Sequence, residues 1–325
     1  MNFHESTTFP DAVAVAAEVL GIRPVLIEKD YWVTYVLRKL AFSAYSDMLV
    51  FKGGTSLSKA YNCIERFSED IDLALLPQEG MNGTQTKKLL SEIDHAITDG
   101  MEYVKGDKKG RNRKTWYNYP KTQIGQSFGA VKEQIQVEIN AFTNPVPYVK
   151  LPIKSYLYDF LLARGNLAII KEHDLLPFEL NILSLERTFF EKTLSLNRLS
   201  YYGTDILKEK IRHFYDLHQL YHRTDLQKNI FEDKSFAILS LVLSDDASIQ
   251  TFDGEWKGKS FGDSPLFASL EILWETLTPT YLEELSNLIW TGTLPTPAEI
   301  LEVMQMIRSF MQRYDQNNKL DRLMI

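Results

Sequence analysis

The chain has little cysteine and no long apolar run: one cysteine, Cys63, occurs in 325 residues. A single cysteine excludes an internal disulfide and is typical of a reducing compartment. No stretch approaches the roughly 20 apolar residues that a membrane-spanning helix needs. The beginning of the sequence also lacks the basic and apolar regions of a secretory signal. The sequence therefore predicts a cytoplasmic protein with no membrane partner.

An overall basic charge is also absent, because the net charge is −7 at pH 7. This balance argues against a general nucleic-acid coat. Residues 105–114 differ: they contain six basic residues and one acidic residue, and Trp116, Tyr117 and Tyr119 follow. Basic side chains beside aromatic ones suit a phosphate backbone and an unstacked base. We expect a hairpin loop here, which is either a contact for RNA or a protein inhibitor, or only a solvated loop tip.

Hydrophobic residues make up 44% of the chain and charged residues 24%, as in ordinary globular proteins. Apolar residues with a period of two predict strands near residues 48–51, 70–76, 101–105, 114–122 and 130–141. Helical spacing predicts helices at 11–20, 24–41, 84–98, 155–163, 183–200, 205–222, 227–244, 264–276, 280–291 and 297–315. The predicted fold class is α+β. A small mixed sheet with flanking helices would occupy residues 1–176, and an all-helical domain residues 177–325.

The most informative stretch is Phe51–Leu73, in which a Gly-Gly-Thr-Ser turn precedes an Asp-x-Asp pair. Asp70 and Asp72 alternate with apolar residues, so both carboxylates lie on one face of a strand. Two such carboxylates repel each other unless a cation lies between them, and Mg²⁺ prefers oxygen ligands while retaining substrate phosphates. Alone, the pair would be a surface feature. With the glycine turn it indicates a site for Mg²⁺, or for Mn²⁺ as the alternative.

The turn before this strand has the composition of a phosphate site. Gly53 and Gly54 allow the backbone to approach a phosphate closely. A helix that begins near Thr55 would aim free N–H groups at the anion, and Ser56 can add a hydroxyl donor. The turn and the carboxylates together predict transfer of a nucleotidyl group from an NTP bound with metal.

A third carboxylate is expected on a neighbouring strand. In the segment Gln134–Asn140, Glu138 lies on the polar side of a strand whose other side is apolar. Alone, Glu138 would fit a partly exposed sheet face. Together with Asp70 and Asp72, it is predicted to complete the metal site.

Several separate motifs in order resemble the AbiEii/AbiGii-type toxin nucleotidyltransferases, a branch of the polymerase-beta-like nucleotidyltransferase superfamily. They extend from about residue 25 to about residue 220 and comprise Ile27–Val33, Lys52–Ser58, Arg66–Leu73, Gln136–Asn140, Glu191–Lys192 and His213–Asp216. The resemblance implies a toxin of a toxin–antitoxin or phage-defence (abortive-infection) pair. Its donor would be an NTP, its acceptor an RNA such as a tRNA 3′ end, and its partner a cognate antitoxin.

The predicted catalytic residues are Asp70, Asp72, Glu138, Lys192 and Asp216, of which Asp70, Asp72 and Glu138 would hold the metal. The predicted nucleotide-binding residues are Gly53, Gly54, Thr55, Ser56 and Lys59. Lys192 and Asp216 depend on the resemblance, which implies that Lys192 neutralises the triphosphate and that Asp216 orients Lys192 or the ribose. Without the resemblance, Lys192 would be a surface lysine and Asp216 a helical partner of Arg212.

Other interpretations stay open at this stage. The acceptor could be a protein hydroxyl in place of RNA, or the chain could be a non-catalytic regulator that binds NTP. Glu28, Lys29 and Asp30 are expected to form a structural charge cluster that anchors the first helices, without a catalytic role.

Overall fold

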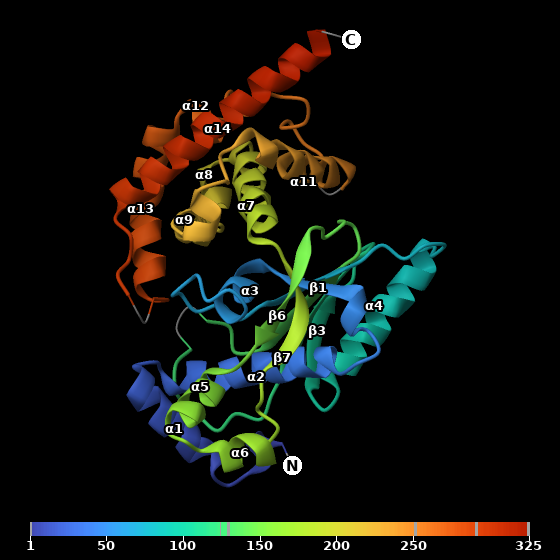
Figure 1. Ribbon diagram of the computed structural model, residues 1–325, viewed down its shortest axis with the longest axis vertical. Coiled ribbons are helices and arrows are strands. Elements are labelled where there is room, and N and C mark those ends of the chain that lie inside the picture. Colours follow the sequence, from blue (N-terminus) through green and yellow to red (C-terminus); the bar gives the residue numbers. More distant parts are fainter. Residues whose placement is uncertain (1, 124, 129–130, 250–251, 290–291, 324–325) are drawn as a thin grey trace. The chain divides into compact units, whose positions relative to one another are not determined.

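The computed structural model (Figure 1) describes residues 2–123, 125–128, 131–249, 252–289 and 292–323, with the side chains of the last helix described as far as Asn318. The chain forms two compact units, Met1–Leu183 and Ser184–Ile325, called here the N-terminal and C-terminal units. The division follows Leu183 and not residue 176, because residues 178–183 form a strand of the sheet.

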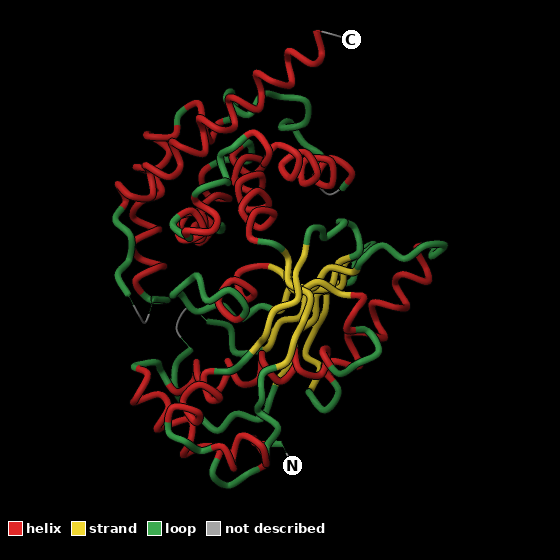
Figure 2. Tube along the Cα trace, in the orientation of Figure 1, coloured by secondary structure: helices red, strands yellow, loops and turns green. Residues whose placement is uncertain are grey.

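The N-terminal unit is built on a seven-stranded sheet in the order β3-β4-β5-β2-β1-β7-β6 (Figure 2). The strands are β1 (Leu49–Lys52), β2 (Ile71–Leu75), β3 (Glu102–Asp107), β4 (Asn112–Asn118), β5 (Ile135–Asn140), β6 (Tyr148–Ile153) and β7 (Phe178–Leu183). β2 pairs with β5 and β1 with β7 in parallel, and the other neighbours are antiparallel. The mixed sheet and the helical C-terminal region confirm the predicted α+β class. Residue 130, where a strand was expected to begin, lies outside the described residues.

Strands β6 and β7 are not predicted by the sequence pattern. β6 contains Pro152, and a proline in a sequence argues against a central strand. Because β6 lies at the edge of the sheet, a missing N–H there need not remove a ladder hydrogen bond. β7 is a short strand that begins directly after Pro177, the residue at the expected domain boundary.

Two helices, α2 (Pro24–Ala41) and α4 (Gly83–Thr98), contact each other and cover one face of the sheet. The indole of Trp32 on α2 lies 5.4 Å from the Tyr119 ring, and Tyr117 of β4 donates a hydrogen bond to Asp94 of α4. The other helices of this unit are η1 (Phe3–Glu5), α1 (Phe9–Leu20), η2 (Ser46–Met48), α3 (Gly53–Lys59), α5 (Tyr156–Ala163) and α6 (Leu167–Glu172). The opposite sheet face carries polar side chains, and the candidate site lies there.

The regular elements described in the C-terminal unit are helices. They are α7 (Leu185–Ser200), α8 (Thr204–Lys208), α9 (Ile211–Tyr221), α10 (Thr224–Gln227), η3 (Asp233–Ser235), α11 (Phe236–Ser248), α12 (Pro265–Ala268), α13 (Leu270–Ser286) and α14 (Pro297–Leu323). Helix α13 runs through Pro279, where two helices were expected. Residues 290–291, at the end of the second expected helix, are not described. Within the described ranges, no helix combines the length and the hydropathy that crossing a bilayer requires.

The hairpin formed by β3 and β4 differs from the loop expected at residues 105–114. The two strands take up most of that segment, so the turn is limited to residues 108–111. The expectation that Arg113 belongs to an exposed basic loop is wrong. Buried and half-exposed residues alternate along β4, and Arg113 falls on the buried side.

Arg113 belongs to a buried polar network around Asp94 of α4. The Arg113 Nε lies 2.6 Å from an Asp94 oxygen, and the two side chains are 8% and 0% exposed. The hydroxyls of Thr115 and Tyr117 each donate to the same carboxylate at 2.9 Å. This network attaches α4 to β4 and satisfies a charge that could not be buried alone.

We predict that Asp94→Ala lowers the free energy of unfolding by about 3–5 kcal/mol, because Arg113 would remain buried without its partner. Urea unfolding measures this loss. The matched control is Glu133→Ala, which removes a surface ion pair with Lys121 in which Glu133 is 61% exposed. Equal losses in the two variants would contradict the structural role of Asp94.

Candidate active site

A row of charged side chains crosses the sheet on the face opposite α2 and α4. The strand register places Lys52 of β1 opposite Asp72 of β2, and Asp72 beside Glu138 of β5. Glu138 in turn lies opposite Lys114 of β4. Directly opposed residues on neighbouring strands share a face, so the four side chains form one line. Its two central members carry charges of the same sign.

Asp72 lies at the most crowded point of this row. Burial raises the pKa of Asp72 to about 7, and the negative charges of Asp70 and Glu138 add to the rise. Gly53 has a φ of +79°, and a Cβ there would come within 2.2 Å of Asp72 Oδ2. The left-handed backbone and this contact both require glycine. Gly53 therefore makes room for the Asp72 carboxylate.

Asp70 and Glu138 are each paired with a lysine that sequence reasoning did not assign to the site. The Lys132 Nζ lies 3.0 and 3.1 Å from the two carboxylate oxygens of Asp70 and 2.8 Å from Gln136 Oε1. The Lys114 Nζ lies 3.1 Å from Glu138 Oε2. The two lysines partly neutralise a cluster of carboxylates. The alternation of side chains along β4 was the sequence signal that could have placed Lys114 on this face.

The expected ligands Asp70, Asp72 and Glu138 lie together, and their chemistry fits a hard divalent cation. Three carboxylates supply the oxygen donors that Mg²⁺ prefers. Burial and then the charges of Asp70 and Glu138 raise the pKa of Asp72, and a cation would favour its ionised form. Among the described residues, no three Asp, Glu, His or Cys side chains are already arranged to hold a metal ion. Asp70 and Glu138 face lysines, so a bound cation would have to displace two ammonium groups.

The glycine turn is held together by its own hydroxyl groups. Thr55 and Ser56 are fully buried, and the Ser56 hydroxyl donates to the Gly53 carbonyl at 2.9 Å. A Cβ on Gly54 would come within 2.6 Å of Arg66 Nη2, so a larger residue there would have to displace the Arg66 guanidinium. We therefore assign the Ser56 hydroxyl to holding the turn and the expected phosphate contact to the turn's backbone.

The segments around the carboxylates are fastened to α2 by the expected charge cluster. The Lys29 Nζ lies 2.8 Å from Glu69 Oε2, directly before Asp70, and donates to the carbonyl of Gln134 at 3.0 Å. Burial lowers the pKa of Lys29 and raises that of Glu69, and the attraction between the two opposes both shifts. Lys29 thus positions Asp70 and the start of β5 from the far side of the sheet.

The other two charges of this cluster hold further loops. Asp30 accepts a hydrogen bond from Lys59 Nζ at 2.6 Å and from the backbone N–H of Tyr156 at 2.8 Å. The two side chains of the Asp30–Lys59 ion pair are each 5% exposed. Lys59 was predicted to bind nucleotide, but its ammonium is held in this buried pair, so we leave it out of the proposed site. Glu28 accepts from the backbone N–H groups of residues 122 and 123.

In the C-terminal unit, α7 and α9 place Lys192 and Asp216 together. The Lys192 Nζ lies 2.8 Å from Asp216 Oδ2, and the side chains are 7% and 0% exposed. Lys192 is therefore not a surface lysine, and Asp216 is placed to orient it. The structure brings the predicted site residues together in two groups, one in each unit.

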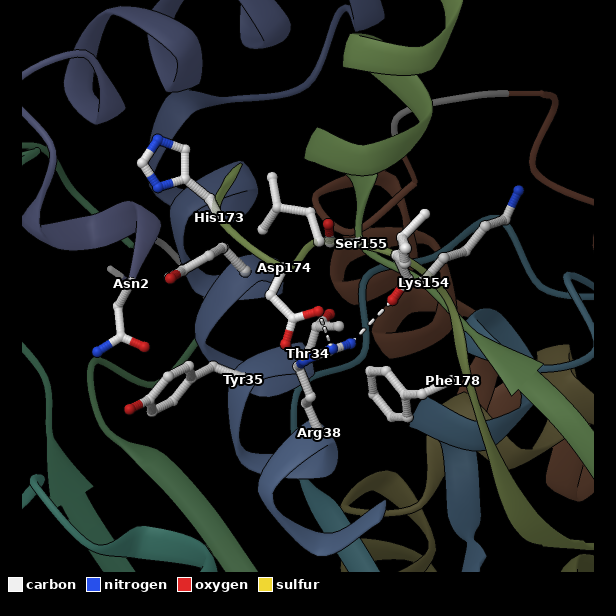
Figure 3. Close-up of a pocket in the computed structure, with 12 residues that line it drawn as sticks. Asn2, Thr34, Tyr35, Arg38, Lys154, Ser155, His173, Asp174 and Phe178 are labelled. Carbon is white, nitrogen blue, oxygen red and sulfur yellow. Dashed lines mark hydrogen bonds and ion pairs between the residues drawn. The ribbon is translucent and has the colours of Figure 1, made fainter. Parts of the chain in front are cut away.

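A separate small cavity of about 70 Å³ in the N-terminal unit is lined by residues of α2 and of the segment before β7 (Figure 3). Its charged groups are neutralised within the protein. Arg38 pairs with Asp174, with Nε 3.1 Å from Oδ2, and donates to the Leu176 carbonyl at 2.9 Å. The cavity contains none of the predicted catalytic residues.

Comparisons with known proteins identify the family of the chain. The profile of a family described as "Nucleotidyl transferase AbiEii toxin, Type IV TA system" matches residues 35–281. The chain therefore belongs to this family of nucleotidyltransferase toxins of type IV toxin–antitoxin systems, which confirms the resemblance seen in the sequence. The family implies a transferase with an NTP substrate and an antitoxin partner.

The fold is similar to that of MenT4, a nucleotidyltransferase toxin from Mycobacterium tuberculosis H37Rv. The TM-score is 0.57 at 18% identity, over 93% of this chain and 92% of that chain. At this identity the likeness shows the fold alone. No curated protein sequence matches the chain.

We predict that Asp72→Asn stabilises the protein without metal at high pH. The folded-state pKa of about 7 lies above the ordinary value of 3.8, so wild-type stability falls as the pH rises between these values. Asparagine resembles the protonated acid, so the melting temperature should rise by a few degrees at about pH 8 and hardly change at about pH 4. Thermal unfolding across pH checks this. A gain that is the same at both pH values would contradict the raised pKa.

We also predict that Asp216→Leu destabilises the protein by about 3–5 kcal/mol, because Lys192 would be left as a buried charge without this partner. The double variant Lys192→Met with Asp216→Leu should recover much of this loss. Urea unfolding of wild type, both single variants and the double variant gives the coupling energy. Strictly additive losses would show that the two side chains do not interact.

Proposed function

We propose that the chain transfers a nucleoside monophosphate from an NTP to the 3′ end of an RNA, with tRNA as the acceptor class, in a reaction that needs Mg²⁺ or Mn²⁺. The observation that carries the proposal is the placement of Asp72 beside Glu138, with Asp70 close enough for its charge to raise the pKa of Asp72 further. Paired carboxylates beside a glycine turn suit metal-assisted transfer of a nucleotidyl group from an NTP.

Asp70, Asp72 and Glu138 would hold the divalent cation. When bound, such an ion neutralises phosphate charge and lowers the pKa of an attacking hydroxyl. Gly53 keeps the Asp72 carboxylate in place, and the turn that it begins faces the triphosphate. Lys114 and Lys132, once released from Glu138 and Asp70, would be available to phosphate oxygens. Lys192, oriented by Asp216, is a further charge partner that the family resemblance suggests.

In the reaction, the acceptor 3′ oxygen bonds to the α-phosphorus while the bond to the bridging oxygen breaks. Pyrophosphate leaves, and the hydroxyl proton passes to solvent. The site residues contribute position and charge and form no covalent bond, as in other phosphoryl-transfer enzymes.

An RNA acceptor is supported by the exposed hairpin turn, in which Lys108, Lys109 and Arg111 face solvent. Phosphate contacts of this kind bring in a nucleic acid without reading its sequence.

The proposal predicts that Asp72→Ala abolishes label transfer and growth inhibition while the protein stays folded. The assay incubates purified protein with each α-labelled NTP, total RNA and Mg²⁺, and then separates RNA from protein. Glu133→Ala, which removes an exposed carboxylate paired with Lys121, is the matched control and should keep wild-type activity. Full activity of Asp72→Ala would refute the metal-site assignment.

The same assay separates the alternatives. Label in protein instead of RNA would show a protein acceptor. NTP binding without metal-dependent pyrophosphate release would show a regulator without catalysis.

A further inference from the structure

Trp116 is an aromatic side chain on the same sheet face as the carboxylates. It lies opposite Gln136 of β5, two residues before Glu138. Its aromatic neighbours differ, because Tyr117 and Tyr119 are 3% and 5% exposed beneath the helices. Of these three residues, Trp116 is the one whose ring stands on the face of the site.

Two lysines flank the Trp116 indole. The Nζ of Lys105 lies 4.9 Å from the ring centroid and that of Lys114 lies 5.7 Å from it. Lys105 reaches this face because the β3–β4 register shifts between residues 103 and 105. Tyr103 pairs with Tyr117, on the face under α4, while Lys105 pairs with Trp116. The shift thus places the Lys105 ammonium beside the indole. In a regular strand the Lys105 side chain would point to the other face of the sheet.

We propose that Trp116 is the platform on which the terminal nucleobase of the acceptor RNA stacks, with Lys105 and Lys114 contacting the adjoining phosphates. This inference rests on the proposed function. Trp116 would be a substrate-positioning residue and takes no part in the bond changes.

The argument for the acceptor, and not the NTP base, comes from the direction of the reaction. The Gly53–Gly54 turn continues from β1, on one side of Asp72, and Trp116 lies on β4, on the other side of Glu138. In an in-line displacement, the attacking and leaving oxygens lie on opposite sides of the phosphorus. If pyrophosphate leaves on the side of the turn, the acceptor approaches from the side of Trp116.

The relative strengths of the contacts allow an RNA base to replace Lys105 on the Trp116 indole. Stacking of a base on an aromatic side chain tightens binding by about 5- to 150-fold. A lysine over an exposed ring contributes a factor of only about 2 to 5. Lys105 is exposed, so it can leave the indole at little cost, and its ammonium then remains beside the incoming phosphate.

The test compares wild type with Trp116→Leu, Trp116→Phe and the control Tyr103→Leu. Tyr103 is an exposed aromatic of the same hairpin with its own lysine neighbour, but it lies on the other face. One measurement is the KM for unfractionated deacylated tRNA and for NTP in the transfer assay. The other, without NTP or metal, is binding of a short single-stranded RNA with a fluorescent 2-aminopurine at its 3′ end, which stacking quenches.

We expect Trp116→Leu to raise the KM for tRNA and the Kd for the fluorescent RNA about 10-fold or more, and to remove the quenching. The KM for NTP should stay nearly unchanged, Trp116→Phe should keep most of the affinity, and Tyr103→Leu should resemble wild type.

Three results would overturn the inference. The first is a raised KM for NTP with tRNA unaffected, which would place the donor base on the indole. The second is equal quenching by wild type and Trp116→Leu. The third is failure of the wild type to bind the fluorescent RNA. Loss of the proposed function gives a different result, since wild type would then transfer no label to RNA, whatever Trp116 does in the binding measurement.

Discussion

The buried ion pair between Lys29 and Glu69 determines where the carboxylates of the N-terminal unit lie. Lys29 belongs to α2, on the covered face of the sheet, whereas Glu69 directly precedes Asp70 on the path to the open face. Neither charge could be buried without the other. The pair therefore couples the position of Asp70, and through Gln134 the start of β5, to the packing of a helix on the opposite side. The positions of the candidate site residues thus depend on contacts made on the other side of the sheet.

The sequence was sufficient where a strand could be judged by itself. Alternation in β2 and β5 placed Asp72 and Glu138 on polar faces, and the structure aligns these strands side by side. The sequence could not show the register between strands, that is, which residues of neighbouring strands lie opposite each other. Lys114 becomes a site residue only because β4 pairs with β5 opposite Glu138, and Arg113 is a core residue because β4 extends into the expected loop. For a similar reason the sequence does not show the buried pair of Lys59 with Asp30, because the two residues are distant in sequence.

The open sheet face concentrates two kinds of interaction in adjoining rows. One row holds the crowded carboxylates and the lysines that balance them. The next holds Gln136, Trp116 and Lys105, and combines polar and aromatic character with a positive charge. Charge suits a phosphate and a flat aromatic suits a base. Side chains along a strand return to the same face at every second residue. The charged row and the aromatic row therefore lie next to each other on one face.

The two outer strands of the sheet have a consequence for how the protein behaves at high concentration. An unpaired strand edge is a template for another chain. On β6, Pro152 lacks the N–H that such pairing would use, and on β3 the register shift and Lys105 interrupt a regular ladder. Both margins therefore resist extension of the sheet from one molecule to the next. A protein whose sheet has two unpaired edges can in this way avoid pairing with a second copy through those edges.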